Sequence, residues 1–333
     1  MEMTGGWSDG VERESVRLSG LLPYEEVAVV MARLGQVHLS KTSVWREAQE
    51  YGRKFQALEE QERISAMVPP AQWHTTMTGV EPVRKGVSMD GGMVYILGEG
   101  WKELKVGSVF EVDRHPGVDR ESKEAVALPN AKAISYVAHL GGPTAFGAMV
   151  WAEARRRDWW QAAETQVVAD GASWIWNLTA LHFGESVQIV DWYHAKSHLV
   201  AAARALYGKE EVAMQRWLKT QERLLYQGHA RRIGEALLTE AQKRPQIAND
   251  LRSEAHYFLK HQRRMQYMAF REEGWVIGSG MVESGIKQYK TRFCGPGMRW
   301  SRAGAERLIP VRTAILNGRF DHRWEQIRNL PPN

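Results

Sequence analysis

Two short apolar runs of this chain each end in an aspartate. The runs TQVVAD (residues 165–170) and SVQIVD (residues 186–191) are rich in β-branched residues, and the segment SWIWNLTALHF between them is long enough for about three helical turns. This alternation predicts a strand, a helix and a second, parallel strand. Functional groups gather at the carboxyl ends of strands in open α/β sheets, so Asp170 and Asp191 are candidates for a site.

Two further carboxylates could join them. Asp90 interrupts the apolar run VSMDGGMVYIL, and Glu283 lies near the start of the late segment GSGMVESGIKQYKTRF, whose residues 281–293 are expected to form a helix. Asp90, Asp170 and Glu283 would offer the hard oxygen ligands that suit two Mg²⁺ or Mn²⁺ ions holding a scissile phosphate. One ion would activate a water or a 3′-hydroxyl group, and the other would stabilise the leaving oxygen.

Each carboxylate also has an ordinary structural explanation. Asp-Gly pairs are common in turns, and both Asp90-Gly91 and Asp170-Gly171 could be turns alone. Glu283 could be a solvated or capping glutamate. The joint placement of the three, at two strand ends and on a later helix, favours the metal site.

The apolar pattern of residues 86–198 predicts the elements that must position these groups. Three runs predict strands and one segment predicts a helix before TQVVAD: residues 87–97, 101–112, 133–140 and 142–157. Gly92 indicates a bulge or a close backbone approach. The order strand, strand, strand, helix, strand, helix, strand is that of an RNase H-like domain, a mixed α/β fold with a five-stranded sheet. Because its first and fourth strands are neighbours, Asp90 and Asp170 are expected to converge.

The segment before this core has the pattern of a helix-turn-helix. LPYEEVAVVMARLG predicts one amphipathic helix, and VHLSKTSVWREAQEYGRKF predicts a second one with Ser40 as its N-cap. In that arrangement four side chains of the second helix would face DNA: Lys41, Thr42, Ser43 and Arg46. The alternative is a two-helix packing module without a nucleic-acid role. The second helix is expected to break at Pro69-Pro70 and to be followed by a loop at 71–82.

These patterns divide the chain into five regions. We predict a flexible N-terminus at 1–20, a helical, helix-turn-helix-like region and linker at 21–70, the first part of the core at 85–198, an all-α insertion at 199–272, and final core helices carrying the glutamate at 273–325.

Composition limits the class of protein. Of the 333 residues 25% are charged and 44% are hydrophobic, which is typical of a globular protein rather than a disordered or fibrous one. The single cysteine, Cys294, excludes an internal disulfide framework and a multi-cysteine zinc site. No apolar run approaches the roughly 18 residues of a membrane span, and the N-terminus lacks the apolar region of a signal peptide. A net charge of +5 is compatible with a polyanionic partner. We therefore expect a cytoplasmic protein with no membrane partner.

Several blocks of the chain resemble a known family. VSMDGG, VADGASWIW followed by IVDWYHAKSHL, and GSGMVESGIKQYKTR with a later MRWS are similar to the three acidic blocks of ISKra-type bacterial insertion-sequence transposases, within the DDE superfamily of RNase H-like recombinases. The resemblance covers roughly residues 20–325. It implies DNA cleavage at transposon ends and transesterification into target DNA, with Asp90, Asp170 and Glu283 as the metal-binding triad. The helical insertion before the glutamate is shared with the Mutator-like and hAT-like branches.

The resemblance also separates Asp191 from the triad. In those related branches a C/DxxH signature follows the second catalytic aspartate by one strand, and DWYH, residues 191–194, matches it. Asp191 and His194 are therefore expected to be a supporting pair that hydrogen-bonds or orients the cleaved strand near the metals. The alternative is a helix cap and a surface histidine. His198 lies one turn after His194 and could form a zinc pair with it, but no further ligands are evident.

Basic residues follow the glutamate. On a helix that starts near Glu283, Lys287 and Lys290 would share its face and could hold backbone phosphates. Further candidates for DNA contacts continue along the chain: Arg292, Arg299, Trp300 and Arg302. A solvated basic face, and core packing of the tryptophan, are the alternatives.

These inferences predict a metal-dependent transposase that binds transposon-end and target DNA as a homo-oligomer, in a bacterial cytoplasm and associated with the nucleoid. The chain starts close to its helix-turn-helix segment, whereas comparable family members have a longer N-terminal region, which puts autonomous transposition in doubt. Two alternatives stay open: a truncated or inactive transposase-derived DNA-binding protein, and an RNase H-like nuclease without a role in transposition.

Overall fold

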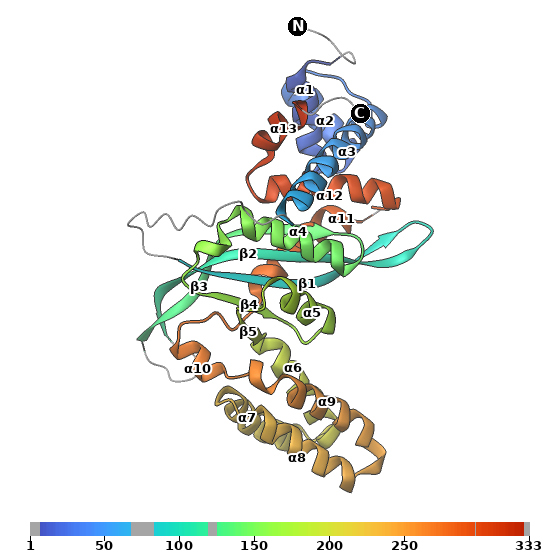
Figure 1. Cartoon of the computed structure of the whole chain (residues 1–333). Coiled ribbons are helices and arrows are strands. Elements are labelled where there is room, and N and C mark those ends of the chain that lie inside the picture. The colour runs from blue at the N-terminus through green and yellow to red at the C-terminus, as the bar shows by residue number, and fades with distance from the viewer. Residues whose placement is uncertain (1–6, 68–82, 119–124, 297, 330–333) are drawn as a thin grey trace.

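A five-stranded mixed sheet lies at the centre of the computed structural model, which describes residues 7–67, 83–118, 125–296 and 298–329 (Figure 1). The strand order is β3-β2-β1-β4-β5. The pairs β1–β2 and β2–β3 are antiparallel, and the pairs β1–β4 and β4–β5 are parallel. The strands are β1 (Arg84–Ile96), β2 (Gly100–Val118), β3 (Ala125–His139), β4 (Thr165–Ala169) and β5 (Val187–Val190). This arrangement confirms the predicted mixed α/β class and is consistent with an RNase H-like core with added helical regions.

The two faces of the sheet bury different side chains of β1. Val87 and Met89 belong to one apolar cluster, and Val94 and Ile96 belong to another. Helices α4 (Pro143–Arg156) and α5 (Ser173–His182) pack in the first cluster, whereas α11 (Gly280–Phe293) and α12 (Arg302–Leu316) pack in the second. Because β4 and β5 are covered on both faces, they read as continuous apolar runs rather than as alternating ones.

The second and third strands are longer than predicted. The expected runs ended at 112 and began at 133, but pairing continues outward to Val118 and Ala125. The outer segments, DRHPGV of β2 and AVALPNAK of β3, contain Pro116, Gly117 and Pro129, and proline within a run argues against a strand. A register shift at Val109/Glu111 and a positive φ of 48° at Ala133 mark the irregularity between the two parts.

The N-terminal helices pack on the core rather than standing apart from it (Figure 1). They are α1 (Asp9–Ser19), α2 (Tyr24–Gly35) and α3 (Lys41–Ala66), and the C-terminal helix α13 (Phe320–Arg328) packs beside α3. The prediction of a flexible segment at 1–20 is wrong for residues 9–19, which form α1 with Val16 fully buried. Besides Val16, the buried residues of α1 are polar, namely Glu12, Ser15 and Ser19, which explains why composition suggested a poorly ordered segment. Residues 1–6, Pro69-Pro70 and the loop at 71–82 lie outside the described residues.

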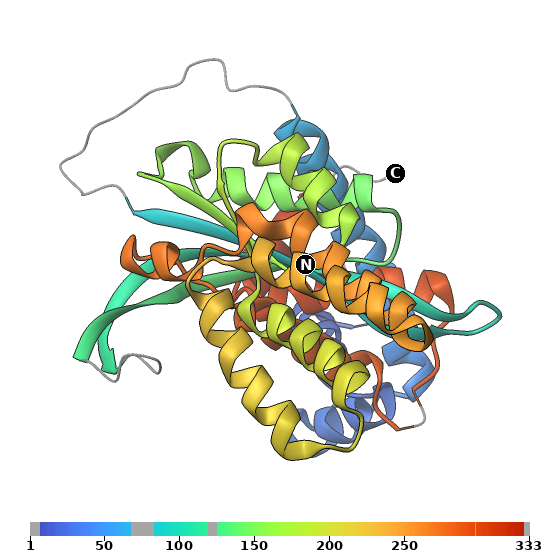
Figure 2. The same ribbon diagram turned by 90° about the horizontal axis from the view of Figure 1, so that it is seen from below.

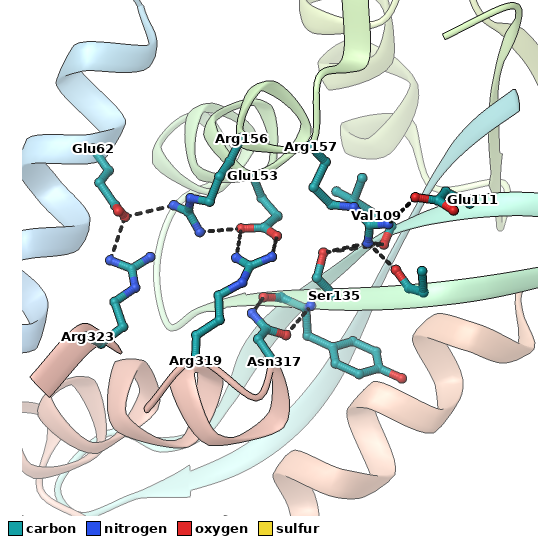
Figure 3. A network of polar contacts seen from close by, with 12 residues as sticks. Glu62, Val109, Glu111, Ser135, Glu153, Arg156, Arg157, Asn317, Arg319 and Arg323 are labelled. Atoms are coloured by element: carbon teal, nitrogen blue, oxygen red, sulfur yellow. Dashed lines mark hydrogen bonds and ion pairs between the residues drawn. The ribbon is translucent and has the colours of Figure 1, made fainter. Parts of the chain in front are cut away.

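A network of charged residues ties these regions together (Figure 3). Glu153 of α4 is 3% exposed and accepts two hydrogen bonds from Arg319, at 2.9 and 2.8 Å, and one from Arg156 at 2.6 Å. Glu62 of α3 lies 2.8 Å from both Arg156 and Arg323 of α13. The network therefore joins the N-terminal helices, the core and the C-terminal end of the chain.

The insertion between β5 and α11 is helical throughout its regular structure (Figure 2). Its elements are α6 (Trp192–Tyr207), α7 (Glu211–Tyr226), α8 (Ala230–Lys243), η2 (Pro245–Ile247), α9 (Ala248–His261), η3 (Gln262–Arg264) and α10 (Tyr267–Glu272). The boundary predicted at residue 199 falls inside α6, which runs unbroken from the end of β5 into the insertion. Among the helices of the described segments, none combines the length and apolar character needed to cross a membrane.

Candidate metal centre

Three aspartates lie in one row across neighbouring strands. Asp170 and Asp191 directly follow β4 and β5, whereas Asp90, expected at a strand end, lies in the middle of β1, which continues to Ile96. Val87 of β1 pairs with Val167 of β4, and Ala169 of β4 pairs with Val190 of β5. Continuing these registers by a few residues places Asp90 beside Asp170, and Asp170 beside Asp191. The amide of Asp191 donates to the carbonyl oxygen of Ala169 at 2.7 Å, so the second ladder does extend to this row. The parallel register brings together carboxylates that are remote in the sequence.

Asp191 also holds the segment that leads into α11. Its Oδ2 accepts a hydrogen bond from the amide of Ser279 at 2.5 Å. The amide of the next residue, Trp192, donates to the carbonyl oxygen of Ile277 at 2.9 Å. Ser279 is the N-cap residue of α11, and its hydroxyl donates to Oε1 of Glu283 at 3.4 Å. The end of β5 therefore positions the start of α11, and with it Glu283.

The second oxygen of Asp191 belongs to a helix cap. Oδ1 accepts from the backbone amide of His194 at 2.7 Å and lies 3.1 Å from its Nδ1. Asp191 is fully buried, and burial would raise the pKa of its carboxyl, but the hydrogen bonds from His194 and Ser279 outweigh it and lower the pKa below the ordinary value. Both the predicted supporting pair and its structural alternative, a helix cap, describe this geometry: Asp191 caps α6 and binds the imidazole of His194.

Burial, hydrogen bonds and neighbouring charges shift the pKa values of the residues in this row. Burial raises the pKa of Asp90 to about 6; the amide of Gly91 opposes this, and the nearby Asp170 and Glu283 raise it further. The hydrogen bond to Asp191 raises the pKa of His194 to about 9 against the effect of burial, and the charges of Asp170 and Asp90 add to the rise. At neutral pH the imidazolium is thus one positive charge facing several carboxylates. A divalent cation would neutralise the remaining negative charge.

One set of residues is gathered closely enough here to hold a metal ion, and the predicted triad overlaps it at Glu283. Among the described residues, ligand atoms of Asp191, His194 and Glu283 lie within 4.8 Å of one another. The predicted triad shares only Glu283 with this set; among the described residues Asp90 and Asp170 do not join Glu283 in a group this close, so the triad stays a prediction. The hydrogen bonds of the carboxylates differ between the two sets. Both oxygens of Asp191 already accept hydrogen bonds. In Asp90 only Oδ1 accepts from a described residue, through the amide of Gly91, and in Asp170 only Oδ1 accepts, from the amide of Ala172. A second oxygen of each of the latter two carboxylates is left for a ligand.

Helix α9 of the insertion covers the loop that follows Asp170. A Cβ atom on Gly171 would lie 2.3 Å from Cε2 of Tyr257, so only glycine permits this close approach. Lys260 donates to the hydroxyl of Ser173 at 3.0 Å. Sequence reasoning singled out none of these α9 residues, and the available signal was the glycine after Asp170, which was interpreted as turn chemistry.

His198 does not face His194 as a zinc partner. Its Nδ1 lies 2.6 Å from Oε2 of Glu254, and its ring stacks on Tyr257 with a centroid distance of 3.5 Å. These contacts join α6 to α9 inside the insertion.

The basic residues after Glu283 fall into two groups. Lys287, Lys290 and Arg299 are exposed. Lys290 lies against β1, because its Cε would be 3.3 Å from a Cβ placed on Gly92. Gly92 therefore marks a close approach, as expected, and Lys290 reaches the same face of β1 as Asp90. Two nitrogens of Arg302 donate to the carboxylate of Glu99, at 2.7 and 2.6 Å, so this ion pair neutralises much of the arginine's charge.

Arg292 and Trp300 are buried and need a correction. Arg292 is 1% exposed; its guanidinium lies over Tyr24 and Trp300 at 5.2 and 4.8 Å, and its Nε donates to the carbonyl oxygen of Ser19 at 2.8 Å. Trp300 is 6% exposed and donates through Nε1 to the carbonyl oxygen of Phe293 at 3.0 Å. DNA can contact only accessible groups, so we remove both from the candidate DNA contacts and assign them to packing.

The helix-turn-helix candidates lie at the start of α3. Ser40 caps the helix as expected, its hydroxyl accepting from the amide of Ser43 at 3.0 Å. Lys41, Thr42 and Arg46 are exposed, and Ser43 is half-buried. Their role in DNA binding stays a prediction.

Comparison with known proteins gives a limited result. No family model matches the chain. Over 65 residues it is 34% identical to a curated protein of Streptococcus gallolyticus described as "UPF0236 protein in vanSb 3'region". The match covers 20% of this chain and only 14% of the length of that relative. The chain is therefore similar to part of a UPF0236 protein.

Proposed function

We propose that this protein is a DDE transposase of an insertion sequence, which binds transposon-end DNA and catalyses metal-dependent strand cleavage and strand transfer. The observation that carries the proposal is the β1–β4 register, which when continued by three residues aligns Asp90 with Asp170, together with α11, which carries Glu283. Carboxylate oxygens are the hard ligands that suit a pair of divalent cations.

In this proposal Asp90, Asp170 and Glu283 hold two Mg²⁺ or Mn²⁺ ions. Bound there, the ions would activate the attacking oxygen and stabilise the leaving oxygen of a phosphodiester. Asp191 is a positioning residue, because its two oxygens fix the N-termini of α6 and α11. His194 places an imidazolium beside the carboxylates, and Lys290 a second cation near Asp90, where each can hold a phosphate oxygen.

DNA is the proposed substrate on two grounds. The acidic blocks of the chain resemble those of insertion-sequence transposases, and exposed basic residues lie on α11 and at the start of α3. A homo-oligomer is proposed because two transposon ends must be handled together.

The test uses an oligonucleotide duplex that carries the inverted repeat flanking the gene. With Mn²⁺ or Mg²⁺ the wild-type protein should nick it at the repeat end. The variants Asp90→Asn, Asp170→Asn and Glu283→Gln should each lose more than about 100-fold in rate, since even residues that only orient metal ligands contribute about 10- to 100-fold. Asp113→Asn is the matched control, because Asp113 is an exposed carboxylate of β2 paired with Lys132.

Binding and folding controls separate the outcomes. Circular dichroism and duplex binding should be unchanged in the four variants. Nicking that survives any triad substitution at the wild-type rate would remove that residue from the metal site. Absence of Mn²⁺-dependent nicking by the wild-type protein would favour an inactive DNA-binding product. Nicking without joining of a pre-cleaved 3′-hydroxyl end to target DNA would favour an RNase H-like nuclease.

A further inference from the structure

A groove on the insertion side of the sheet edge is lined by basic residues and by no acidic residue. It has a volume of 520 Å³ and lies where β5 meets the end of α9 and η3. Its basic residues are Lys260, Arg263 and Arg264, and its other lining residues are neutral. We call these three residues and their neutral neighbours the basic groove. Glu185 precedes β5 but does not line the groove.

The three cations have no acidic partner within the described parts of the chain. Lys260 donates to the hydroxyl of Ser173 at 3.0 Å, and Arg264 donates to the amide oxygen of Gln188 at 2.8 Å. Arg263 is exposed. Other exposed basic residues such as Arg232 are also without an ion pair among the described residues, but here three cations line one groove.

Two of the cations are already held in place. The guanidinium of Arg264 lies 4.3 Å from the ring centroid of Trp176, besides its bond to Gln188. Lys260 donates a hydrogen bond to Ser173 at the start of α5. Ordering these side chains on binding therefore costs little, which favours an anionic ligand.

Two contacts relate the groove to the candidate metal centre. Gln188 of β5 lies three residues before Asp191, which corresponds to about 10 Å along a strand. Lys260 contacts Ser173, three residues after Asp170. A chain of phosphates lying in the groove would thus approach the row of aspartates from the β5 edge of the sheet.

We propose that the basic groove binds the phosphate backbone of the DNA strand that enters the metal centre. The proposal rests on the proposed function, and it gives the insertion a role in holding substrate. Three unpaired cations along an open groove fit a repeating polyanion, because each can take a different phosphate.

The experiment measures DNA binding without catalysis. Fluorescence anisotropy of a labelled duplex is followed in EDTA over a range of salt concentrations, with full-length protein carrying Glu283→Gln. Adding Arg263→Gln should weaken binding several-fold and reduce the slope of log K against log salt by about 0.9, the value for one phosphate contact. Arg263→Glu should weaken it further. Arg232→Gln on α8 is the matched control, since Arg232 is also exposed and has no ion pair among the described residues.

The proposal is overturned if Arg263→Gln leaves affinity and salt slope at the parent values, or if Arg232→Gln changes both equally. An effect of Arg263→Gln on an RNA duplex but not on DNA would also overturn it. Because EDTA removes cleavage from the readout, the two hypotheses fail separately: a protein that never nicks DNA can still show the groove effect, and an active transposase can lack it.

Discussion

Asp191 shows how a single buried carboxylate can organise a site without being its main ligand. One oxygen accepts from two nitrogens of His194, and the other accepts from the amide of Ser279. A carboxylate is needed here because it only accepts hydrogen bonds, whereas an asparagine would turn its amide group toward one of these donors.

We therefore expect Asp191→Asn to leave a buried donor unsatisfied, at a cost of about 1–3 kcal/mol in the free energy of unfolding. DNA nicking should fall by about 10- to 100-fold, the range for residues that orient metal ligands. Urea unfolding and the nicking assay measure the two effects. If Asp191→Asn behaves like the surface change Asp113→Asn in both, Asp191 has no positioning role.

His261 makes stability depend on pH. Burial, with contributions from Arg264 and Lys260, lowers its pKa to about 4 from an ordinary value of 6.5. Between these values the unfolded chain binds a proton that the folded chain does not, so the stabilisation is complete above about pH 6.5 and is lost as the pH falls toward 4. The loss has a slope of at most about 1.4 kcal/mol per pH unit.

His261→Gln should accordingly flatten the decrease in unfolding free energy between pH 7 and pH 5. His256→Gln, an exposed change on the same helix, should leave the decrease as it is in the wild type. Parallel pH profiles for wild type and His261→Gln would contradict this assignment.

At the scale of elements, the loop after β4 depends on the contact with α9. Gly171→Ala would place a methyl group 2.3 Å from the ring of Tyr257, and overpacking of this kind costs about 1–3 kcal/mol. In a Tyr257→Ala background the same change should be less harmful, which a double-mutant cycle of unfolding free energies measures. Gly142→Ala is the control, since no atom lies within 4 Å of its added carbon. Additive effects would show that the contact does not constrain the loop.

The elements also show what sequence patterns can and cannot predict. Strands β4 and β5 and helix α5 were predicted because short, continuous apolar runs separated by a helical pattern have few other interpretations. Helix α1 was missed, because three of its four buried residues are polar and give no hydrophobic pattern. That β1 and β4 are neighbours, which the convergence of Asp90 and Asp170 requires, was predicted from strand order. The contacts of Tyr257 and Lys260 could not be predicted, because nothing local to α9 indicates which loop it covers.

Burial is the other limit of sequence reasoning. Arg292 looked like part of a basic surface, yet it is enclosed by two aromatic rings and by the C-terminal end of α1. A charged residue is read as exposed by default, and only the tertiary packing of distant helices reverses that expectation.

At the scale of the whole molecule, the Glu153 network makes the N-terminal helices, the core and α13 one unit (Figure 3). Glu153→Gln would leave Arg319 without its buried counter-charge, and we expect a loss of about 3–5 kcal/mol. Glu240→Gln, which breaks exposed pairs on α8, should cost less than about 1 kcal/mol. Equal losses in urea unfolding would show that the network does not hold the regions together.

The central claim is that Asp90, Asp170 and Glu283 form a two-metal centre. Anomalous scattering from crystals soaked in Mn²⁺ tests this claim most directly, because it locates the ions themselves. The account predicts two Mn²⁺ peaks, with Asp90, Asp170 and Glu283 as the protein ligands and Asp191 still bound to the amides of His194 and Ser279. A single ion held by Asp191, His194 and Glu283, or no ion bound by Asp90 and Asp170, would contradict it.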